Sequence, residues 1–124
     1  MSNVVLYVDD EEEICQLAQK FLESKGLVVY CAANGVEGIA VFNEHRDEIS
    51  VVVTDVLMPE MDGVEMIRVL LTIKPSVKVI VASSIIPLLD SFAPATEFIM
   101  KPYSLDELLR FIGQLETRFT DQEE

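Results

Sequence analysis

Three aspartates follow two short apolar runs, and these are the residues best suited to chemistry. Asp9 and Asp10 come directly after residues 4–8, and Asp55 comes directly after residues 49–54. Runs that are apolar throughout and rich in β-branched residues predict strands buried on both faces of a sheet. If the two strands are neighbours in a parallel sheet, the carboxylates converge at one edge and repel one another. We therefore expect Mg²⁺, a hard cation that takes few protein oxygens and several waters.

Two further polar residues end later apolar runs. Ser83 follows residues 77–82, and Lys101 follows residues 98–100. A carboxylate nucleophile, a divalent cation, a lysine and a hydroxyl donor form a constellation suited to phosphoryl transfer. Each residue alone is more simply explained as a turn former, a helix cap or a surface side chain. The prediction therefore depends on all of them reaching the same edge of one sheet.

The elements that must position these residues alternate regularly along the chain. Apolar runs are separated by stretches whose apolar residues recur at helical spacing. Such alternation with short links predicts a parallel sheet covered by helices on both faces. The predicted fold class is α/β, a flavodoxin-like doubly wound five-stranded parallel sheet of order 2-1-3-4-5. A Rossmann-like order remains the alternative, because periodicity does not determine strand order. The predicted strands cover residues 4–8, 27–32, 49–54, 77–82 and 98–100.

The helices are predicted from their apolar faces and their ends. Gly26 is the expected C-terminal cap of the first helix, and the pair Asn34-Gly35 is expected to form a turn after the second strand. Ser104 is expected to cap the last helix, with Glu107 completing a capping box. The expected core faces of the first two helices are Ile14, Leu17, Ala18, Phe21 and Leu22, and then Val36, Ile39, Ala40 and Phe42.

Composition bounds the class of protein. Nine Lys and Arg against 22 Asp and Glu give a net charge of −13, which argues against binding of nucleic acid or an anionic membrane by this chain. No apolar run approaches the roughly 20 residues that span a bilayer. Cys15 and Cys31 are isolated in the sequence, which favours two free thiols acting as small apolar side chains in a reducing cytoplasm. We expect a cytoplasmic domain over residues 1–117, followed by a polar tail or linker over residues 118–124.

Four motifs resemble those of the receiver domain of bacterial two-component response regulators. The resemblance covers residues 3–117, and the second motif is highly specific in combination with the other three. The motifs are Val8-Asp9-Asp10-Glu11, Thr54-Asp55-Val56-Leu57-Met58-Pro59-Glu60-Met61-Asp62-Gly63, Ala82-Ser83-Ser84 and Met100-Lys101-Pro102-Tyr103.

The resemblance implies a role for each acidic residue of the site. Asp55 is implied as the phosphoacceptor and as a ligand of Mg²⁺. Asp10 is implied to bind Mg²⁺ directly, and Asp9 to bind it through water. The backbone carbonyl of Leu57 is implied as a further ligand.

The resemblance also implies how the phosphoryl group is held and sensed. Lys101 is implied to pair with the phosphoryl group, Ser83 to hydrogen-bond one of its oxygens, and Phe98 to be the family's switch aromatic. Leu57 and Ile85 each lie two residues after a site residue, and both are apolar where a polar side chain could position an attacking water. We therefore expect slow self-hydrolysis of the phosphoryl group.

The implied function is a phosphoacceptor switch rather than an enzyme. The implied donor is a sensor histidine kinase, a phosphotransfer protein or a small acyl phosphate, and the output partner or domain is unknown. Two alternatives remain open: a Mg²⁺-dependent aspartyl-phosphate hydrolase, and a phosphorylation-independent interaction module of receiver-like fold. Flavin and nucleotide binding are disfavoured, because the phosphate-binding loops that they require are absent from the sequence.

The segment between Ser83 and Phe98 departs from the family pattern. Only 14 residues separate the two, and Pro87 and Pro94 bracket the part that could be helical. Because proline restricts helix interiors and the residue before it, we expect the fourth helix to be shortened or irregular. Receiver domains commonly dimerise or contact outputs through this helix and the strand and helix that follow it, so the oligomeric state stays open.

Overall fold

A computed structural model describes residues 4–55, 63–83 and 96–123 of the chain. Within these residues, five parallel strands form one sheet in the order β2-β1-β3-β4-β5. The predicted order 2-1-3-4-5 is confirmed, and the Rossmann-like alternative is wrong. Each strand overlaps its predicted apolar run. The strands are β1 (Val4–Val8), β2 (Val28–Ala32), β3 (Ile49–Asp55), β4 (Lys78–Ser83) and β5 (Thr96–Met100).

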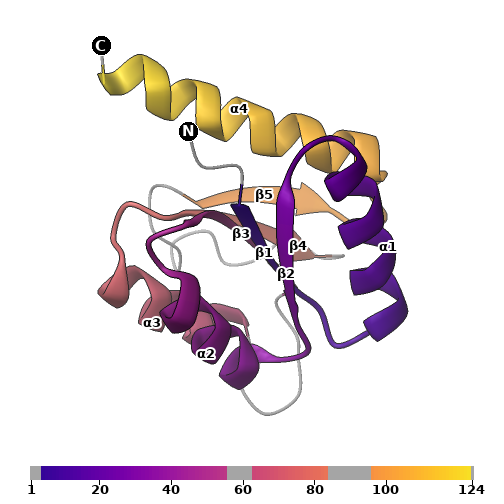
Figure 1. Cartoon of the computed structure of the whole chain (residues 1–124), viewed down its shortest axis with the longest axis horizontal. Coiled ribbons are helices and arrows are strands. Elements are labelled where there is room, and N and C mark those ends of the chain that lie inside the picture. Colours follow the sequence, from indigo (N-terminus) through magenta and orange to yellow (C-terminus); the bar gives the residue numbers. More distant parts are fainter. Residues whose placement is uncertain (1–3, 56–62, 84–95, 124) are drawn as a thin grey trace.

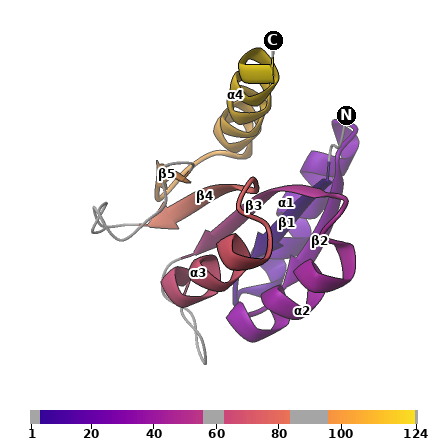
Figure 2. The same ribbon diagram turned by 90° about the vertical axis from the view of Figure 1, so that its left-hand side faces the viewer.

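Helices cover both faces of this sheet. Helices α1 and α4 lie against one face, and α2 and α3 lie against the other (Figure 1 and Figure 2). Successive side chains of a strand point to opposite faces, so Val5 and Tyr7 join one core cluster while Leu6 and Val8 join the other. This double burial explains why β1 is apolar throughout. The helices of the described chain are α1 (Glu12–Ser24), α2 (Gly35–His45), α3 (Gly63–Ile73) and α4 (Leu105–Glu123).

The buried face of α1 differs from the predicted one. Cys15, Ala18 and Leu22 are buried, whereas Ile14 is 39% exposed and Leu17 is 63% exposed. The prediction that Ile14 and Leu17 belong to the core is wrong, because the helix is rotated so that Cys15, Ala18 and Leu22 face the sheet. Two large apolar side chains of α1 therefore remain at the surface.

Helix α2 packs through small residues rather than through its aliphatic ones. The prediction that Val36 and Ala40 line the core is wrong, since both are exposed. A Cβ at Gly38 would lie 2.8 Å from Sδ of Met66 and 3.4 Å from Cγ2 of Val8. The lack of a side chain at this position lets the helix approach β1 and α3 closely. The buried residues of α2 are Gly35, Gly38 and Phe42.

The helix ends follow the predicted capping, with one difference. Gly26 ends α1 with φ 94°, a left-handed conformation that favours glycine. Ser104 Oγ accepts a hydrogen bond from the Glu107 N–H at 3.1 Å, as expected at the start of α4. Asn34 is the N-cap of α2, not part of an isolated turn, and its side-chain oxygen accepts from the Glu37 N–H at 2.8 Å.

Helix α4 extends through the segment expected to be a tail. Leu108 and Ile112 are buried and Leu109 is half-buried, and the helical backbone continues to Glu123. In both views its C-terminal end projects beyond the sheet (Figure 1 and Figure 2). The domain boundary at residue 117 stays a prediction.

Several predictions fall on parts of the chain that the structure does not describe. The expected shortened helix after Ser83, and the positions of Leu57 and Ile85, lie outside the described residues. Among the helices that are described, none combines the length and the apolar character required to cross a bilayer.

Candidate functional site

Strand register brings the three aspartates to one edge of the sheet. Val8 of β1 pairs with Thr54 of β3, so the residues that follow them, Asp9 and Asp55, lie at the same carboxyl edge. One oxygen atom from each of Asp9, Asp10 and Asp55 lies within 4.8 Å of the other two. The convergence expected from the sequence is therefore present in the fold.

The three carboxylates differ in their exposure. Asp9 is only 4% exposed, Asp55 is half-buried and Asp10 is exposed. Burial raises the pKa of Asp9, and the charges of Asp55 and Asp10 raise it further. The Glu11 N–H, which donates to Asp9 Oδ1 at 2.9 Å, and the charge of Lys101 lower it without cancelling the rise. The surroundings of Asp9 thus disfavour its charged form.

Lys101 supplies a positive charge at this edge. Its Nζ lies 2.6 Å from Oδ2 of Asp55, and the two side chains are 31% and 15% exposed. Burial lowers the pKa of Lys101, but the hydrogen bond and the charge of Asp55 outweigh this effect, so the net pKa is raised. Lys101 therefore stays protonated beside the carboxylate. The peptide bond that joins it to Pro102 is cis.

Ser83 and Phe98 lie on the two strands at the far side of the sheet. Ser83 pairs in register with Met100, which places its backbone at the edge that carries Lys101. Phe98 pairs with Val81, and its half-buried ring packs against the core cluster on the side of α2 and α3. The roles of Ser83 and Phe98 stay predictions.

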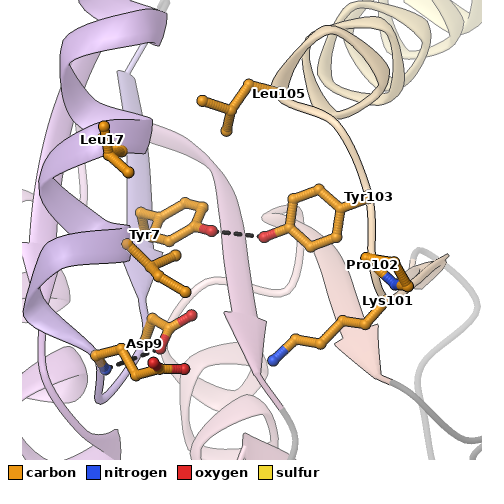
Figure 3. Close-up of a pocket in the computed structure, with 9 residues that line it drawn as sticks. Tyr7, Asp9, Leu17, Lys101, Pro102, Tyr103 and Leu105 are labelled. Atoms are coloured by element: carbon orange, nitrogen blue, oxygen red, sulfur yellow. Dashed lines mark hydrogen bonds between the residues drawn. The ribbon is translucent and has the colours of Figure 1, made fainter.

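A hollow of about 540 Å³ opens between α1 and the start of α4. Figure 3 shows Asp9 and Lys101 in its wall, with Leu17 and Leu105 on the α1 and α4 sides. Sequence reasoning missed this feature because it assigned Leu17 to the core. The hollow adjoins the acidic edge and presents mostly apolar side chains beside it.

Two tyrosines in this hollow link β1 to the loop before α4. The hydroxyl groups of Tyr7 and Tyr103 lie 2.5 Å apart, and one donates to the other (Figure 3). Burial is the main cause of a raised pKa for both phenols, so both remain neutral hydrogen-bonding groups. A phenol in the middle of an otherwise aliphatic strand was the sequence signal that could have identified this contact.

The donor set fits a hard divalent cation. Asp9, Asp10 and Asp55 offer carboxylate oxygens close together, and Lys101 compensates only one of the three negative charges. The exposure of Asp10 leaves one side of the cluster open to water, as suits Mg²⁺, which retains several waters. These residues could hold Mg²⁺, which would relieve the remaining repulsion.

Comparisons with known proteins identify similar sequences and folds. The family model described as the response regulator receiver domain matches residues 5–113. The sensor kinase CckA of Brucella abortus (strain 2308) is 37% identical over 120 residues, which are 92% of this chain and 12% of that protein. The chemotaxis protein CheY of Bacillus subtilis (strain 168) is 29% identical over 119 residues, which are 92% of this chain and 98% of that protein. The chain therefore spans a small part of one relative and nearly all of the other.

Solved structures share the fold. A response regulator receiver domain protein from Clostridium thermocellum superposes with a TM-score of 0.83 at 28% identity, over 97% of this chain and 98% of that one. The CheY-like receiver domain protein from Methanospirillum hungatei JF-1 gives a TM-score of 0.83 at 26% identity, over 98% and 99%. Both comparisons extend over the whole sheet and its helices.

Proposed function

Because the chain belongs to the response regulator receiver domain family, we propose that it is a phosphoacceptor switch in which Asp55 takes up a phosphoryl group with the help of Mg²⁺. The observation that carries this proposal is the contact of 2.6 Å between Lys101 Nζ and Asp55 Oδ2 beside the clustered oxygens of Asp9, Asp10 and Asp55. A carboxylate, a lysine and a metal-binding cluster are the parts that phosphoryl transfer to an aspartate requires.

Each residue has a proposed part in the transfer. An oxygen of Asp55 attacks the phosphorus atom, and the bond from phosphorus to the leaving group of the donor breaks. Asp10 and Asp55 would hold Mg²⁺, with Asp9 acting through water and the Leu57 carbonyl as a further ligand. Mg²⁺, when bound, supplies positive charge that neutralises the phosphoryl oxygens. Lys101 adds a second positive charge there, which stabilises the transition state electrostatically.

Phosphorylation is proposed to change the surface at the far side of the sheet. A phosphoryl group adds about −1.5 to −2 charges to the edge that carries Ser83 and Lys101. Ser83 then moves towards the phosphoryl group and hydrogen-bonds one of its oxygens. Phe98 turns into the space that Ser83 has left. The population of the phosphorylated, active form rises, and the surface that includes β5 and α4 is presented to an output partner.

The donor is proposed to be a phosphohistidine on a sensor histidine kinase or a phosphotransfer protein. Its histidine must reach Asp55, so the surface around that histidine has to rest on the residues that surround the acidic edge. Leu17 and Ile14 are exposed apolar side chains on α1 at the hollow that adjoins Asp9 and Lys101. Their position supports docking of the donor on α1 and on the loop that leads into α4.

Acetyl phosphate with Mg²⁺ tests the assignment of Asp55 directly. The wild-type chain is expected to gain the mass of one phosphoryl group, and Asp55→Asn is expected to gain none. Asp47→Asn is the matched control, since Asp47 is an exposed aspartate outside the site. Addition of EDTA should abolish the gain in the wild type. An Asp55→Asn variant that acquires the same adduct would overturn the assignment.

The same experiment separates the alternative functions. Phosphate released steadily, well beyond one equivalent per chain, would indicate a hydrolase. No adduct on the wild type from acetyl phosphate or from phosphoramidate, a small donor with a P–N bond, would indicate a phosphorylation-independent module. We expect instead one stable adduct that decays slowly, because Leu57 and Ile85 provide no polar group for an attacking water.

A further inference from the structure

The two cysteines, which are isolated in the sequence, lie side by side in the fold. Cys15 of α1 and Cys31 of β2 are both free thiols. The Cys31 Sγ donates a hydrogen bond to the Cys15 carbonyl oxygen at 3.4 Å, and the Cys15 Sγ donates to the Tyr7 carbonyl oxygen at 3.4 Å. The expectation of two free thiols is confirmed, and packing of α1 on the edge strand β2 brings them together.

Both thiols can be reached from the surface near the acidic edge. They line a hollow of about 470 Å³ whose wall also includes Asp9 and Asp10. Cys31 is half-buried, whereas Cys15 is 4% exposed. A small molecule that enters this hollow meets Cys31 first and finds Cys15 next to it.

The surroundings favour Cys31 as the more reactive thiol. The neighbouring Cys15 side chain lowers the pKa of Cys31, although burial and the charge of Glu23 act in the opposite direction. The neighbouring Cys31 side chain, followed by burial, raises the pKa of Cys15. An accessible thiol of lowered pKa beside a second thiol is the arrangement found in redox-sensitive cysteine pairs. The net charge of −13 disfavours anionic oxidants such as glutathione disulfide and leaves neutral hydrogen peroxide as the suitable one.

We propose that hydrogen peroxide oxidises Cys31 and Cys15 to an intramolecular disulfide, and that this bond slows phosphoryl transfer at the neighbouring acidic site. The Cys31 thiolate attacks peroxide, the O–O bond breaks, and Cys31 sulfenic acid and hydroxide form. The Cys15 thiol then attacks the sulfenic sulfur, an S–S bond forms, and the sulfenic oxygen leaves as water. In total the two thiols lose two electrons and two protons, and one peroxide becomes two waters.

The disulfide would act on the turn that carries Asp9 and Asp10. The Cys15 N–H donates to the Glu11 carbonyl at 3.1 Å, and the Asp9 N–H donates to the Ala32 carbonyl at 3.0 Å. The turn is therefore anchored to α1 next to one cysteine and to β2 next to the other. An S–S bond between the two cysteines would fix α1 to β2 at these anchors and restrain the turn that carries Asp9 and Asp10. This consequence rests on the proposed function, whereas formation of the disulfide does not.

Intact-mass measurement of the wild-type chain tests the disulfide. After dilute peroxide and alkylation with N-ethylmaleimide, we expect a monomer that has lost two hydrogens and carries no alkyl group, and dithiothreitol should reverse this. Peptide mapping locates the bond and distinguishes it from sulfoxide at the exposed Met100. In Cys15→Ala, dimedone should trap Cys31 as a sulfenic acid. Two thiols that remain fully alkylatable after treatment, or a disulfide-linked dimer, would overturn the proposal.

Phosphorylation by acetyl phosphate tests the consequence separately. The oxidised wild type should incorporate phosphate several-fold more slowly than the reduced chain, and dithiothreitol should restore the rate. The Cys31→Ala variant is the control for other oxidation, and its rate should not change on peroxide treatment. An intramolecular disulfide with an unchanged rate would refute the regulatory effect. Absence of phosphorylation in the reduced wild type would instead count against the proposed function.

Discussion

At the scale of single residues, the raised pKa of Asp9 links the protonation of this carboxylate to the stability of the fold. Burial and two neighbouring carboxylates raise its pKa in the folded chain. The folded state therefore holds the Asp9 proton more tightly than the unfolded state does. Stability conferred by that proton is present at low pH and is lost as the pH rises from the unfolded pKa through the raised folded pKa. At neutral pH the charge on Asp9 opposes folding until a cation compensates it.

The substitution Asp9→Asn should therefore raise the melting temperature in EDTA at neutral pH by several degrees. The difference from wild type should shrink as the pH falls through the raised pKa of Asp9, because the wild-type carboxyl then becomes neutral as well. Added Mg²⁺ should stabilise the wild type more than the variant, since a ligand that binds only the folded state stabilises it. Thermal unfolding followed by circular dichroism measures all three effects.

The control for this prediction is Asp47→Asn, which removes the same charge from an exposed position. It should leave the response of the melting temperature to Mg²⁺ unchanged. A lower melting temperature for Asp9→Asn in EDTA at neutral pH would show that its carboxylate stabilises the metal-free fold, contrary to this account.

At the scale of elements, two helical glycines, Gly38 and Gly113, differ in how closely other residues pack against them. Gly38 of α2 is buried where a Cβ would meet Met66 and Val8, whereas nothing lies within 4 Å of a Cβ at the exposed Gly113 of α4. Close packing against a neighbouring element therefore does not explain the glycine at position 113. Of these two glycines, only Gly38 permits a close approach between elements.

The substitution Gly113→Ala should raise the free energy of unfolding by about 1 kcal/mol, the usual difference between alanine and glycine in a helix interior. The substitution Gly38→Ala should give a smaller gain or a loss, because its Cβ would lie 2.8 Å from Sδ of Met66. Urea unfolding of both variants provides the comparison. An equal gain at both positions would mean that Met66 moves aside at no cost.

Helix α1 presents one face to the core and leaves Ile14 and Leu17 at the surface, where we propose that the phosphoryl donor docks. Truncation of its exposed residue by Leu17→Ala should slow phosphorylation by a histidine kinase that phosphorylates the wild type, and leave the rate with acetyl phosphate unchanged. The physical reason is that only a macromolecular donor contacts the surface around the site. The matched control is Val36→Ala, which truncates a side chain of 53% exposure on α2, at the opposite face of the sheet. Equal rates for Leu17→Ala and wild type with the kinase would contradict docking on α1.

At the scale of the whole molecule, the excess of acidic residues affects stability as well as partners. A net charge of −13 on a chain of 124 residues produces self-repulsion in the compact state. Most of these acids lie outside the site, so screening rather than specific binding should relieve their repulsion. Mg²⁺ at the carboxylate cluster is a separate, local effect.

The melting temperature should therefore rise as NaCl is increased from low concentration to about 0.5 M, where the screening length falls to a few ångströms. At matched ionic strength, MgCl₂ should raise it further in the wild type, and this additional rise should be smaller in Asp10→Asn. Differential scanning calorimetry separates the two contributions. A melting temperature that falls with NaCl would show that attractive ion pairs, rather than repulsion, dominate the charge balance.

From the sequence alone the five strands and the gathering of Asp9, Asp10, Asp55 and Lys101 at one edge could be predicted, whereas the strand order stayed open between two alternatives until the structure decided it. The gathering depends on local patterns and on one general rule, that the carboxyl ends of parallel strands meet at one edge. The end of α1 at Gly26 could be predicted for a similar reason, since a left-handed cap is a local requirement for glycine.

Only the tertiary structure decided which side of each helix is buried and which distant residues meet. Helical periodicity does not specify how a helix is rotated against the sheet, so Leu17 and Val36 were wrongly assigned to the core. Cys15 and Cys31 are 16 residues apart in the chain, and they meet because β2 pairs with β1 while α1 packs across both. Such contacts depend on packing between elements, which local patterns of residue types do not predict.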